Sequence, residues 1–405
     1  MNFSHRMATK TISVRNADGT PAAGKTVRIS QTRHAFLFGC GAFDALEFVN
    51  AQDRSKEAFY ADRMDKWTAL FNFGTLPFYW GRYEPVEGQD MGEPTMKAAK
   101  WLRERGITLK GHPLCWHTVC ADWLMAYPND VILTKQLARI HREVERFAGI
   151  IDMWDVINEV VIMPVFDKYD NAITRIAKDL GRVGIIREVF GAARNSNPQA
   201  TLLLNDFNTS RDYENLVEQC LESGIPIDVI GIQSHQHQGY WGLGKLHTVL
   251  DRFSRFGLPI HFTENTLISG HLMPKEIKDL NDYQIPEWPS TPEGEDRQAR
   301  EIVEMYTALF AHPLVEAVTA WDFTDGEWLG APSGVLRRDN SVKPAYLALL
   351  QKIKKDWWTV EDAVTDEEGR IRLTGYKGDY AVTGSGGKAA FTLDGDGGEI
   401  AVTLA

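Results

Sequence analysis

Two glutamates about a hundred residues apart have the chemistry for acid–base work. Asn158 and Glu159 cut off the apolar run Ile150–Ile157, and Glu264 follows the strand-like run Pro259–Thr263. An apolar run ended by polar residues is typical of a buried parallel strand that stops at a functional rim. Glycoside hydrolysis requires two carboxyl groups, which two glutamates at the ends of two buried strands can supply. The hypothesis requires one fold that brings both side chains together.

Other polar and aromatic side chains follow the same kind of strand. The ends of the predicted third to eighth strands carry His112, Trp116, His117, Asn158, Asn205, Gln233, His235, Trp321 and Trp328. Singly, a His can be a core residue, an Asn a helix cap and a Trp a volume filler. Six strands that all end in sugar-binding side chains are hard to explain as packing, so the coincidence favours a carbohydrate site.

The central part of the chain alternates apolar strands with amphipathic stretches. The eight predicted strands are Ala35–Phe43, Asn72–Phe78, Thr108–Trp116, Ile151–Glu159, Thr201–Phe207, Asp228–His235, Pro259–Glu264 and Ala317–Asp325. The predicted helices are Arg54–Leu70, Pro94–Arg105, Asp130–Phe147, Gly181–Arg194, Arg211–Ser223, Lys245–Phe256, Asp296–Phe310 and Pro344–Lys355. Eight strand–helix units predict an α/β fold of the (β/α)8 TIM-barrel type. A doubly wound sheet is the alternative, but Gly39-Cys40-Gly41 lacks the third glycine of a phosphate-binding turn.

Both ends of the chain have a β pattern instead. Thr11–Arg15 and Lys25–Ser30 alternate around a turn at Asp18–Gly19, which indicates an antiparallel pair with one solvated face. Four further strands are predicted after Trp358, at Arg370–Thr374, Asp379–Thr383, Ala389–Leu393 and Glu399–Leu404. We expect residues 1–33 and 357–405 to close one small β-sandwich that buttresses a barrel of residues 34–356.

The composition of the chain argues against some classes of binding partner. The 405 residues carry a formal charge of −11 and no basic block, which argues against nucleic acid and anionic membranes. No apolar run approaches the length of a membrane span. Met1–Lys10 lacks the apolar core of a signal peptide, so the protein is either cytoplasmic or extracellular or periplasmic after loss of a leader. We expect a monomer whose partner is a polysaccharide or oligosaccharide.

The cysteines and histidines give no metal pattern. Cys40, Cys115, Cys120 and Cys220 lack paired spacing, which favours buried free thiols over a disulfide framework or zinc. A metal-dependent barrel hydrolase is a rival, because His112, His117, His235 and His237 resemble ligands superficially. We predict no metal and no cofactor.

Six stretches together resemble glycoside hydrolase family 10, which consists mainly of endo-β-1,4-xylanases built as (β/α)8 barrels. They are Gly111–His117, Trp154–Glu159, Leu204–Asn208, Gly231–His235, Thr263–Glu264 and Lys343–Tyr346, within a resemblance that runs from about His34 to Lys355. The resemblance implies that Glu159 is the general acid/base and Glu264 the nucleophile. It also places His112, Trp116, Asn158, Gln233, His235, Trp321 and Trp328 around the sugar that is cleaved at its anomeric carbon.

The chain departs from the family pattern in three places. The Glu, Asn and Lys that bind the next sugar in the family are Thr75, Leu76 and Tyr79 here, before Trp80. The Asp that orients the active-site His is Thr266, and a long Pro-rich loop, Leu267–Glu295, follows the seventh strand. Loss of hydrogen-bonding groups predicts weaker xylan binding, with Tyr79 and Trp80 as replacement apolar surface.

We infer that the protein is a retaining β-glycosidase, and the first activity we predict is that of an endo-β-1,4-xylanase. Because the second strand departs from the family, the same chemistry on a short, decorated or aryl-linked β-glycoside is the alternative. A catalytically silent carbohydrate-binding barrel is a further alternative, which the presence of both glutamates disfavours. The long loop after Glu264 is expected to wall the cleft.

Overall fold

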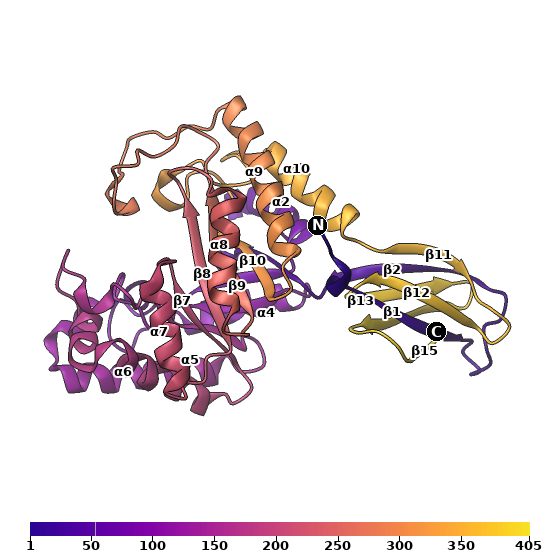
Figure 1. Ribbon diagram of the computed structural model, residues 1–405, viewed down its shortest axis with the longest axis horizontal. Helices are drawn as coiled ribbons and strands as arrows, with labels where there is room; N and C mark the ends of the chain where they lie inside the picture. The colour runs from indigo at the N-terminus through magenta and orange to yellow at the C-terminus, as the bar shows by residue number, and fades with distance from the viewer. Residues whose placement is uncertain (53) are drawn as a thin grey trace.

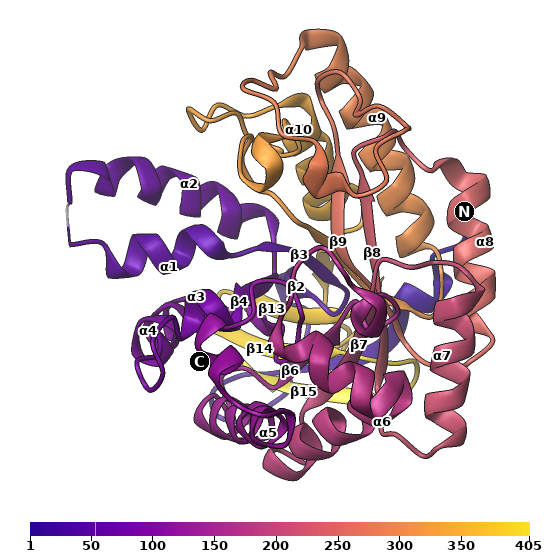
Figure 2. The ribbon, with the colours of Figure 1, turned by 90° about the vertical axis from the view of Figure 1, so that its left-hand side faces the viewer.

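The computed structural model describes residues 1–52 and 54–405 and contains a closed barrel of eight strands (Figures 1 and 2). The strands pair in parallel in the order β10-β3-β4-β5-β6-β7-β8-β9. Their bounds are β3 (Leu37–Gly41), β4 (Phe73–Pro77), β5 (Thr108–His112), β6 (Met153–Asn158), β7 (Thr201–Asp206), β8 (Val229–Gln236), β9 (Ile260–Leu267) and β10 (Val315–Ala320). All eight predicted barrel strands are present, and the barrel fold is confirmed.

Helices alternate with the strands and cover the outside of the barrel (Figure 2). They are α1 (Phe43–Asn50), α2 (Glu57–Leu70), α3 (Trp80–Tyr83), α4 (Gly92–Arg103), α5 (Asn129–Arg146), α6 (Ala172–Ser196), α7 (Arg211–Glu222), α8 (Gly242–Ser254), α9 (Pro292–Phe310) and α10 (Pro344–Gln351). Short helical turns complete the loops: η1 (Ser4–Arg6), η2 (Arg54–Lys56), η3 (Asp122–Ala126), η4 (Met163–Val165), η5 (Leu280–Asp282), η6 (Trp328–Gly330) and the π-helical η7 (Lys352–Asp356).

Local sequence explains these elements. In α7 the buried side chains are Tyr213, Leu216, Val217 and Cys220, a spacing that puts them on one helix face. The barrel strands are instead apolar on both faces, because side chains fill the barrel on one side and helices cover the other; β9 is buried along its whole length. Side chains cap the starts of α6, α7 and α9, as where Thr291 accepts from the Gly294 amide at 3.1 Å before α9.

Two smaller sheets, built from both chain ends, lie at one end of the barrel (Figure 1). One has the order β12-β1-β15 and the other β11-β2-β13-β14. Their bounds are β1 (Met7–Arg15), β2 (Thr26–His34), β11 (Val360–Val364), β12 (Arg370–Tyr376), β13 (Gly378–Gly384), β14 (Gly387–Leu393) and β15 (Glu399–Thr403). Their facing side chains share one apolar core, separate from that of the barrel. The exact domain boundaries stay a prediction.

Several local predictions need correction. β1 and β2 do not pair with each other but belong to different sheets, because each finds C-terminal strands as partners. The chain also forms α1 and β11, which we did not predict, and α6 begins well before Gly181, where its backbone is non-helical. β9 runs three residues beyond Glu264, since β8 pairs with it as far as Leu267.

Among the residues that the structure describes, no helix is long and apolar enough to cross a membrane.

Candidate active site

Glu159 stands directly after β6 with a backbone that few side chains adopt. Its φ is +58°, in the left-handed region, and its amide donates to the Asn205 carbonyl of the neighbouring strand at 2.9 Å. A non-glycine residue in this conformation costs about 1–3 kcal/mol and persists where surrounding structure imposes it, which is common at active sites. β6 and β7 together therefore hold Glu159 in place.

The Glu159 carboxyl group accepts three hydrogen bonds. The Trp116 indole donates to Oε2 at 2.9 Å, and the side-chain amides of Asn158 and Gln233 each donate to Oε1 at 3.1 Å. Trp116 lies beyond the end of β5, and Gln233 lies in β8. Three different barrel strands thus converge on one carboxyl group.

Glu264 lies inside β9 and is 4% exposed. Its Oε1 accepts from the Asn205 amide at 2.9 Å, and its Oε2 is 3.1 Å from His235 Nε2. His112 Nε2 lies 3.9 Å from Oε1 on the other side. The carboxylate therefore sits among an amide and two imidazoles, all of which can donate a hydrogen bond.

The two carboxyl groups have opposite pKa shifts. Burial, and after it the nearby charge of Glu264, raises the pKa of Glu159 to about 8. Burial also acts to raise the pKa of Glu264, but His112, His235 and Lys110 outweigh it and hold that pKa below its usual value. These shifts favour one protonated and one ionised carboxyl group at neutral pH, which is the combination that acid-assisted displacement requires.

A cluster of buried amides connects the two glutamates. Asn205 donates to Asn158 Oδ1 at 2.8 Å as well as to Glu264, and Gln233 donates to Asn158 Oδ1 at 3.0 Å as well as to Glu159. Thr263 donates to Asn205 Oδ1 at 2.6 Å. Because each amide is held at several atoms, the positions of both carboxyl groups are fixed before any substrate arrives.

A buried charged group supports His112 from inside the barrel. Asp155 Oδ2 lies 2.7 Å from His112 Nδ1 and 2.6 Å from Lys110 Nζ, and all three side chains are at most 1% exposed. Burial opposes ionisation of Asp155, yet Lys110 and His112 keep its pKa below the usual value. Lys110 and Asp155 were not predicted as site residues from the sequence, although a charged residue inside an apolar strand indicates a buried partner.

His235 Nδ1 has a hydroxyl group, not a carboxylate, as its neighbour. Its Nδ1 lies 3.3 Å from the Thr266 hydroxyl oxygen, which also accepts from the Gln236 amide at 3.2 Å. The Trp328 ring lies 4.3 Å from the His235 ring, and Trp321 lies 5.2 Å from His112, all between ring centroids. The two tryptophans therefore flank the imidazoles that face Glu264.

Tyr79 packs next to His112 and Trp116. Its ring centroid is 5.6 Å from those of both His112 and Trp116. Burial raises the pKa of its hydroxyl well above the usual value, and the charge of Glu264 adds to this. Thr75 and Leu76 are completely buried.

Two of the predicted site residues, Trp80 and His117, pack against other side chains rather than against the two glutamates. The Trp80 indole donates to Glu84 at 3.1 Å and its ring packs against Trp123 at 5.7 Å. His117 is 1% exposed, packs against Phe166 at 4.5 Å, and has a pKa lowered by burial to about 4. Within the described part of the chain, neither residue has a hydrogen bond to Glu159 or Glu264.

The long loop after β9 is partly organised. Trp288 packs with Ile268, Met273 and Ala331 in a small apolar cluster, and its indole donates to the His271 carbonyl at 2.9 Å. The loop is joined to the β6–α6 loop, because Lys168 lies 2.6 Å from Asp279 and 2.7 Å from Asp282. In residues 1–52 and 54–405, no three His, Cys, Asp or Glu side chains are grouped as a metal site would require.

The family model described as glycosyl hydrolase family 10 matches residues 77–352. Among curated proteins, an endo-1,4-beta-xylanase/feruloyl esterase of Xylanibacter ruminicola is 29% identical over 305 residues, which cover 67% of this chain and 40% of that protein. Endo-1,4-beta-xylanase 2 of Arabidopsis thaliana is 25% identical over 377 residues, 90% of this chain and 31% of the relative. The chain thus spans less than half of either relative.

Solved structures show the same fold. A family 10 enzyme from Paenibacillus barcinonensis superposes with a TM-score of 0.63 at 23% identity, covering 79% of this chain and 96% of that one. Xylanase 10B of Thermotoga petrophila in complex with xylobiose gives 0.61 at 21% identity, with 78% and 94% covered. The family match covers more than half of the chain and includes both glutamates. The chain belongs to glycosyl hydrolase family 10 and is a glycoside hydrolase.

Proposed function

We propose that this enzyme is a retaining β-glycosidase, an endo-β-1,4-xylanase, with Glu159 as general acid/base and Glu264 as nucleophile. The observation that carries the proposal is that one amide cluster joins two glutamates whose pKa values are shifted in opposite directions. A retaining mechanism needs this pair, with carboxyl groups about 5–5.5 Å apart. The names of the relatives support xylan as the substrate.

Each step uses one of the two carboxyl groups. Glu264 attacks the anomeric carbon and forms a glycosyl ester, while the proton on Glu159 passes to the departing glycosidic oxygen. Glu159, now ionised, takes a proton from a water molecule, whose oxygen displaces Glu264 from the anomeric carbon. The second displacement restores the starting configuration and returns both side chains to their first protonation states.

The surrounding residues are proposed to bind the reacting sugar. Asn158 has its amide next to Glu159, where a bond to the sugar 2-hydroxyl strengthens as positive charge develops. The other proposed contacts are His112, Trp116, Asn205, Gln233, His235, Trp321, Trp328 and Tyr79. Trp80 and His117, which pack behind these side chains, are proposed to support them from behind.

The second strand favours an alternative substrate. Thr75 and Leu76 are fully buried and the Tyr79 ring packs against His112 and Trp116, so this part of the site offers a ring and one hydroxyl in place of charged and amide groups. A site with few hydrogen-bonding groups gains little from xylan's hydroxyls. A short, decorated or aryl-linked β-glycoside is therefore the second candidate for the same chemistry.

The mechanism is tested with an aryl β-xyloside and the variants Glu159→Ala and Glu264→Ala. We expect both to lose activity, and azide to restore Glu264→Ala with an α-glycosyl azide as product. Azide with Glu159→Ala should give the β-anomer, because Glu264 still forms the ester. Full activity in both variants would refute the roles given to the two glutamates.

Substrate choice is tested by product profiles on linear xylan, arabinoxylan and β-glucan. An endo-xylanase releases a range of short oligosaccharides from linear xylan. Hydrolysis of the aryl xyloside with no cleavage of any xylan would favour the second candidate. Wild-type activity that survives a chelator would separate both candidates from a metal-dependent hydrolase.

A further inference from the structure

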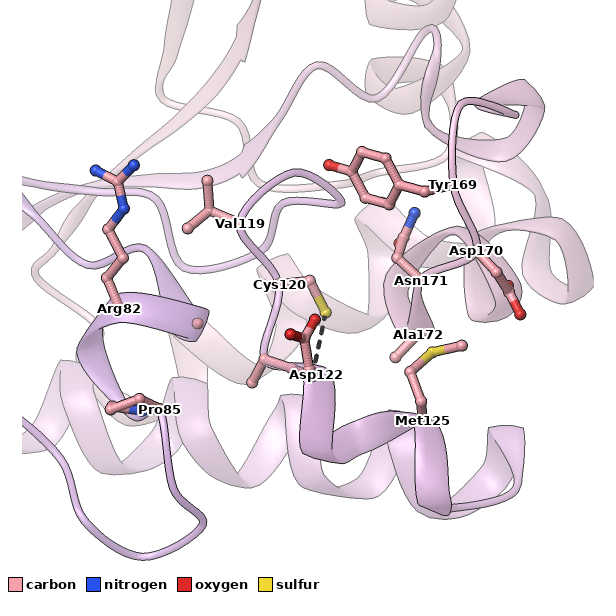
Figure 3. Close-up of a pocket in the computed structure, with 12 residues that line it drawn as sticks. Arg82, Pro85, Val119, Cys120, Asp122, Met125, Tyr169, Asp170, Asn171 and Ala172 are labelled. Carbon is pink, nitrogen blue, oxygen red and sulfur yellow. Dashed lines mark hydrogen bonds between the residues drawn. The ribbon is translucent and has the colours of Figure 1, made fainter.

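A recess of about 410 Å³ lies among the loops that follow three neighbouring barrel strands, β4, β5 and β6 (Figure 3). Arg82, Val119, Asp122 and Tyr169 are among the residues that line it. Its volume falls in the range of small-molecule sites, about 300–1,000 Å³. None of the steps proposed above uses this recess.

The recess is next to the active site because its walls continue the same loops. Arg82 follows Tyr79, and its guanidinium carbon lies 5.8 Å from the Tyr79 ring centroid. Val119 follows Trp116, and Tyr169 follows Glu159 in the loop that leads to α6. The loops that carry Tyr79, Trp116 and Glu159 therefore also line the recess.

The wall around Val119 is held in an unfavourable conformation. Val119 has a φ of +52°, which is an outlier for a β-branched residue, and its carbonyl accepts from the Gly81 amide at 2.8 Å. A Cβ atom on Gly81 would lie 2.6 Å from the Cys120 carbonyl oxygen, so this close approach requires glycine. Strain of this kind persists only where the surrounding structure imposes it.

The opposite wall, which carries Tyr169, is also held in place. Lys168 is bound by Asp279 and Asp282 from the loop after β9, at 2.6 Å and 2.7 Å. Phe166 packs against Tyr169 with a centroid distance of 4.8 Å. The recess is therefore a preformed space between two fixed loops.

The groups that face the recess suit a neutral, hydroxyl-rich ligand. The Asp122 carboxyl and the Tyr169 ring point into it, whereas Asp170 points away and accepts from Arg175 at 3.0 Å (Figure 3). Within the described residues, Arg82 and Asp122 make no ion pair. One cation, one carboxylate and one aromatic ring can bind hydroxyl groups and a sugar face, while Asp122 disfavours an anion.

We propose that this recess binds a neutral sugar branch, of the pentose class, carried by the β-linked chain that the active site cleaves. The inference rests on the proposed function, since it needs that chain in the cleft. With Asp170 turned away, the recess presents one carboxyl group where glycoside hydrolysis needs two, so it binds the branch without cleaving it. The recess makes the enzyme select branched over linear chains.

The test compares a linear β-1,4-xylo-oligosaccharide with the same chain carrying one arabinofuranosyl branch. For Asp122→Asn and Tyr169→Ala we expect kcat/KM on the branched chain to fall about tenfold, the effect of about 1.4 kcal/mol. Activity on the linear chain and on an aryl β-xyloside should stay within about twofold of wild type. Asp130→Asn, which changes an exposed residue of α5, is the matched control and should leave kcat/KM on all three substrates unchanged.

Equal effects on branched and linear chains, or no effect, would overturn the proposal. A glucuronosyl branch is the third substrate: wild type should discriminate against it, and Asp122→Asn should reduce that discrimination. Preference for the acidic branch would contradict the neutral class. Calorimetric titration of Glu264→Gln with the branched oligosaccharide, with and without Asp122→Asn, tests the recess without turnover. A wild type inactive on every substrate would instead refute the proposed function.

Discussion

At the scale of single residues, Glu159 and Glu264 are chemically identical and differ only in their neighbours. Glu159 accepts from neutral indole and amide groups, and its buried acid form is favoured further by the Glu264 charge. Glu264 faces His112 and His235, which favour its ionised form despite burial. The environment, rather than the residue type, gives the two carboxyl groups the opposite pKa shifts that the proposed acid and nucleophile need.

These shifts predict the pH dependence of activity. The proposed mechanism needs Glu159 protonated and Glu264 ionised, so kcat/KM on an aryl β-xyloside should fall as pH rises through about 8, where Glu159 loses its proton. On the acid side it should fall only below the ordinary glutamate range, because the pKa of Glu264 is lowered. A pH–rate profile measures both limbs. An alkaline limb near the ordinary glutamate pKa would contradict the assignment of Glu159.

The buried Lys110–Asp155 pair predicts a large stability effect. Lys110→Met removes the cation that compensates a fully buried carboxylate, and we expect a loss of about 3–5 kcal/mol in the free energy of unfolding. Denaturant titration measures the loss. Lys100→Met, an exposed change on α4, should stay within about 0.5 kcal/mol of wild type. Similar values for the two variants would show that Asp155 does not depend on Lys110.

At the scale of elements, the site depends on how closely neighbouring strands approach. Asn205 in β7 pairs with Gly231 in β8, and a Cβ atom on Gly231 would lie 2.5 Å from Asn205 Oδ1. Asn205 in turn contacts Asn158 and Glu264. The spacing of β7 and β8 therefore sets the position of the amide cluster.

Gly231→Ala should consequently impair catalysis more than folding. The new methyl group displaces the Asn205 amide, and we expect kcat to fall by about tenfold or more with about 1–3 kcal/mol of destabilisation. Steady-state kinetics and thermal unfolding measure the two effects. Gly191→Ala in α6, where a Cβ meets no atom within 4 Å, is the control and should preserve activity and stability. Unchanged kcat in Gly231→Ala would disprove the role of this contact.

At the scale of the whole molecule, the two terminal sheets lie at the amino ends of the barrel strands. Arg6 donates to the Phe310 and His312 carbonyls at 2.9 Å and 2.7 Å, and Arg33 donates to the Gly106 carbonyl at 3.1 Å, just before β5. The glutamates lie toward the carboxyl ends of the strands. The sheets therefore support the barrel from the face opposite the active site (Figure 1).

Arg6→Met should lower stability without changing chemistry. The exchange leaves the carbonyls at the start of β10 without their donor, and we expect a loss of about 1–3 kcal/mol. The aryl-glycoside kcat/KM should stay within about twofold of wild type at a temperature where the variant is folded. A large loss of kcat without loss of stability would mean that the terminal sheets act on the active site.

The hydrophobic pattern of the sequence was sufficient to predict the barrel. It also predicted which candidate site residues lie at the ends of the strands. Apolar strands alternating with amphipathic helices predict each barrel strand, because both periodicities arise from local burial. The pairing of β1 was not predictable in this way. β1 and β2 have the alternation and turn of a hairpin, yet β1 pairs with β12 and β15, hundreds of residues away. Strand partners depend on distant chain segments that a local pattern does not contain.

Residue types and their spacing alone determined the fold class and the family, and they singled out the two glutamates as the proposed catalytic pair. Each of these follows from local burial or from short motifs. Only the tertiary structure decided which glutamate is protonated, that Lys110 and Asp155 support His112, and that Trp80 packs behind the site. Protonation and support depend on charges and desolvation from several strands, and these neighbours are brought together by barrel closure, not by sequence adjacency.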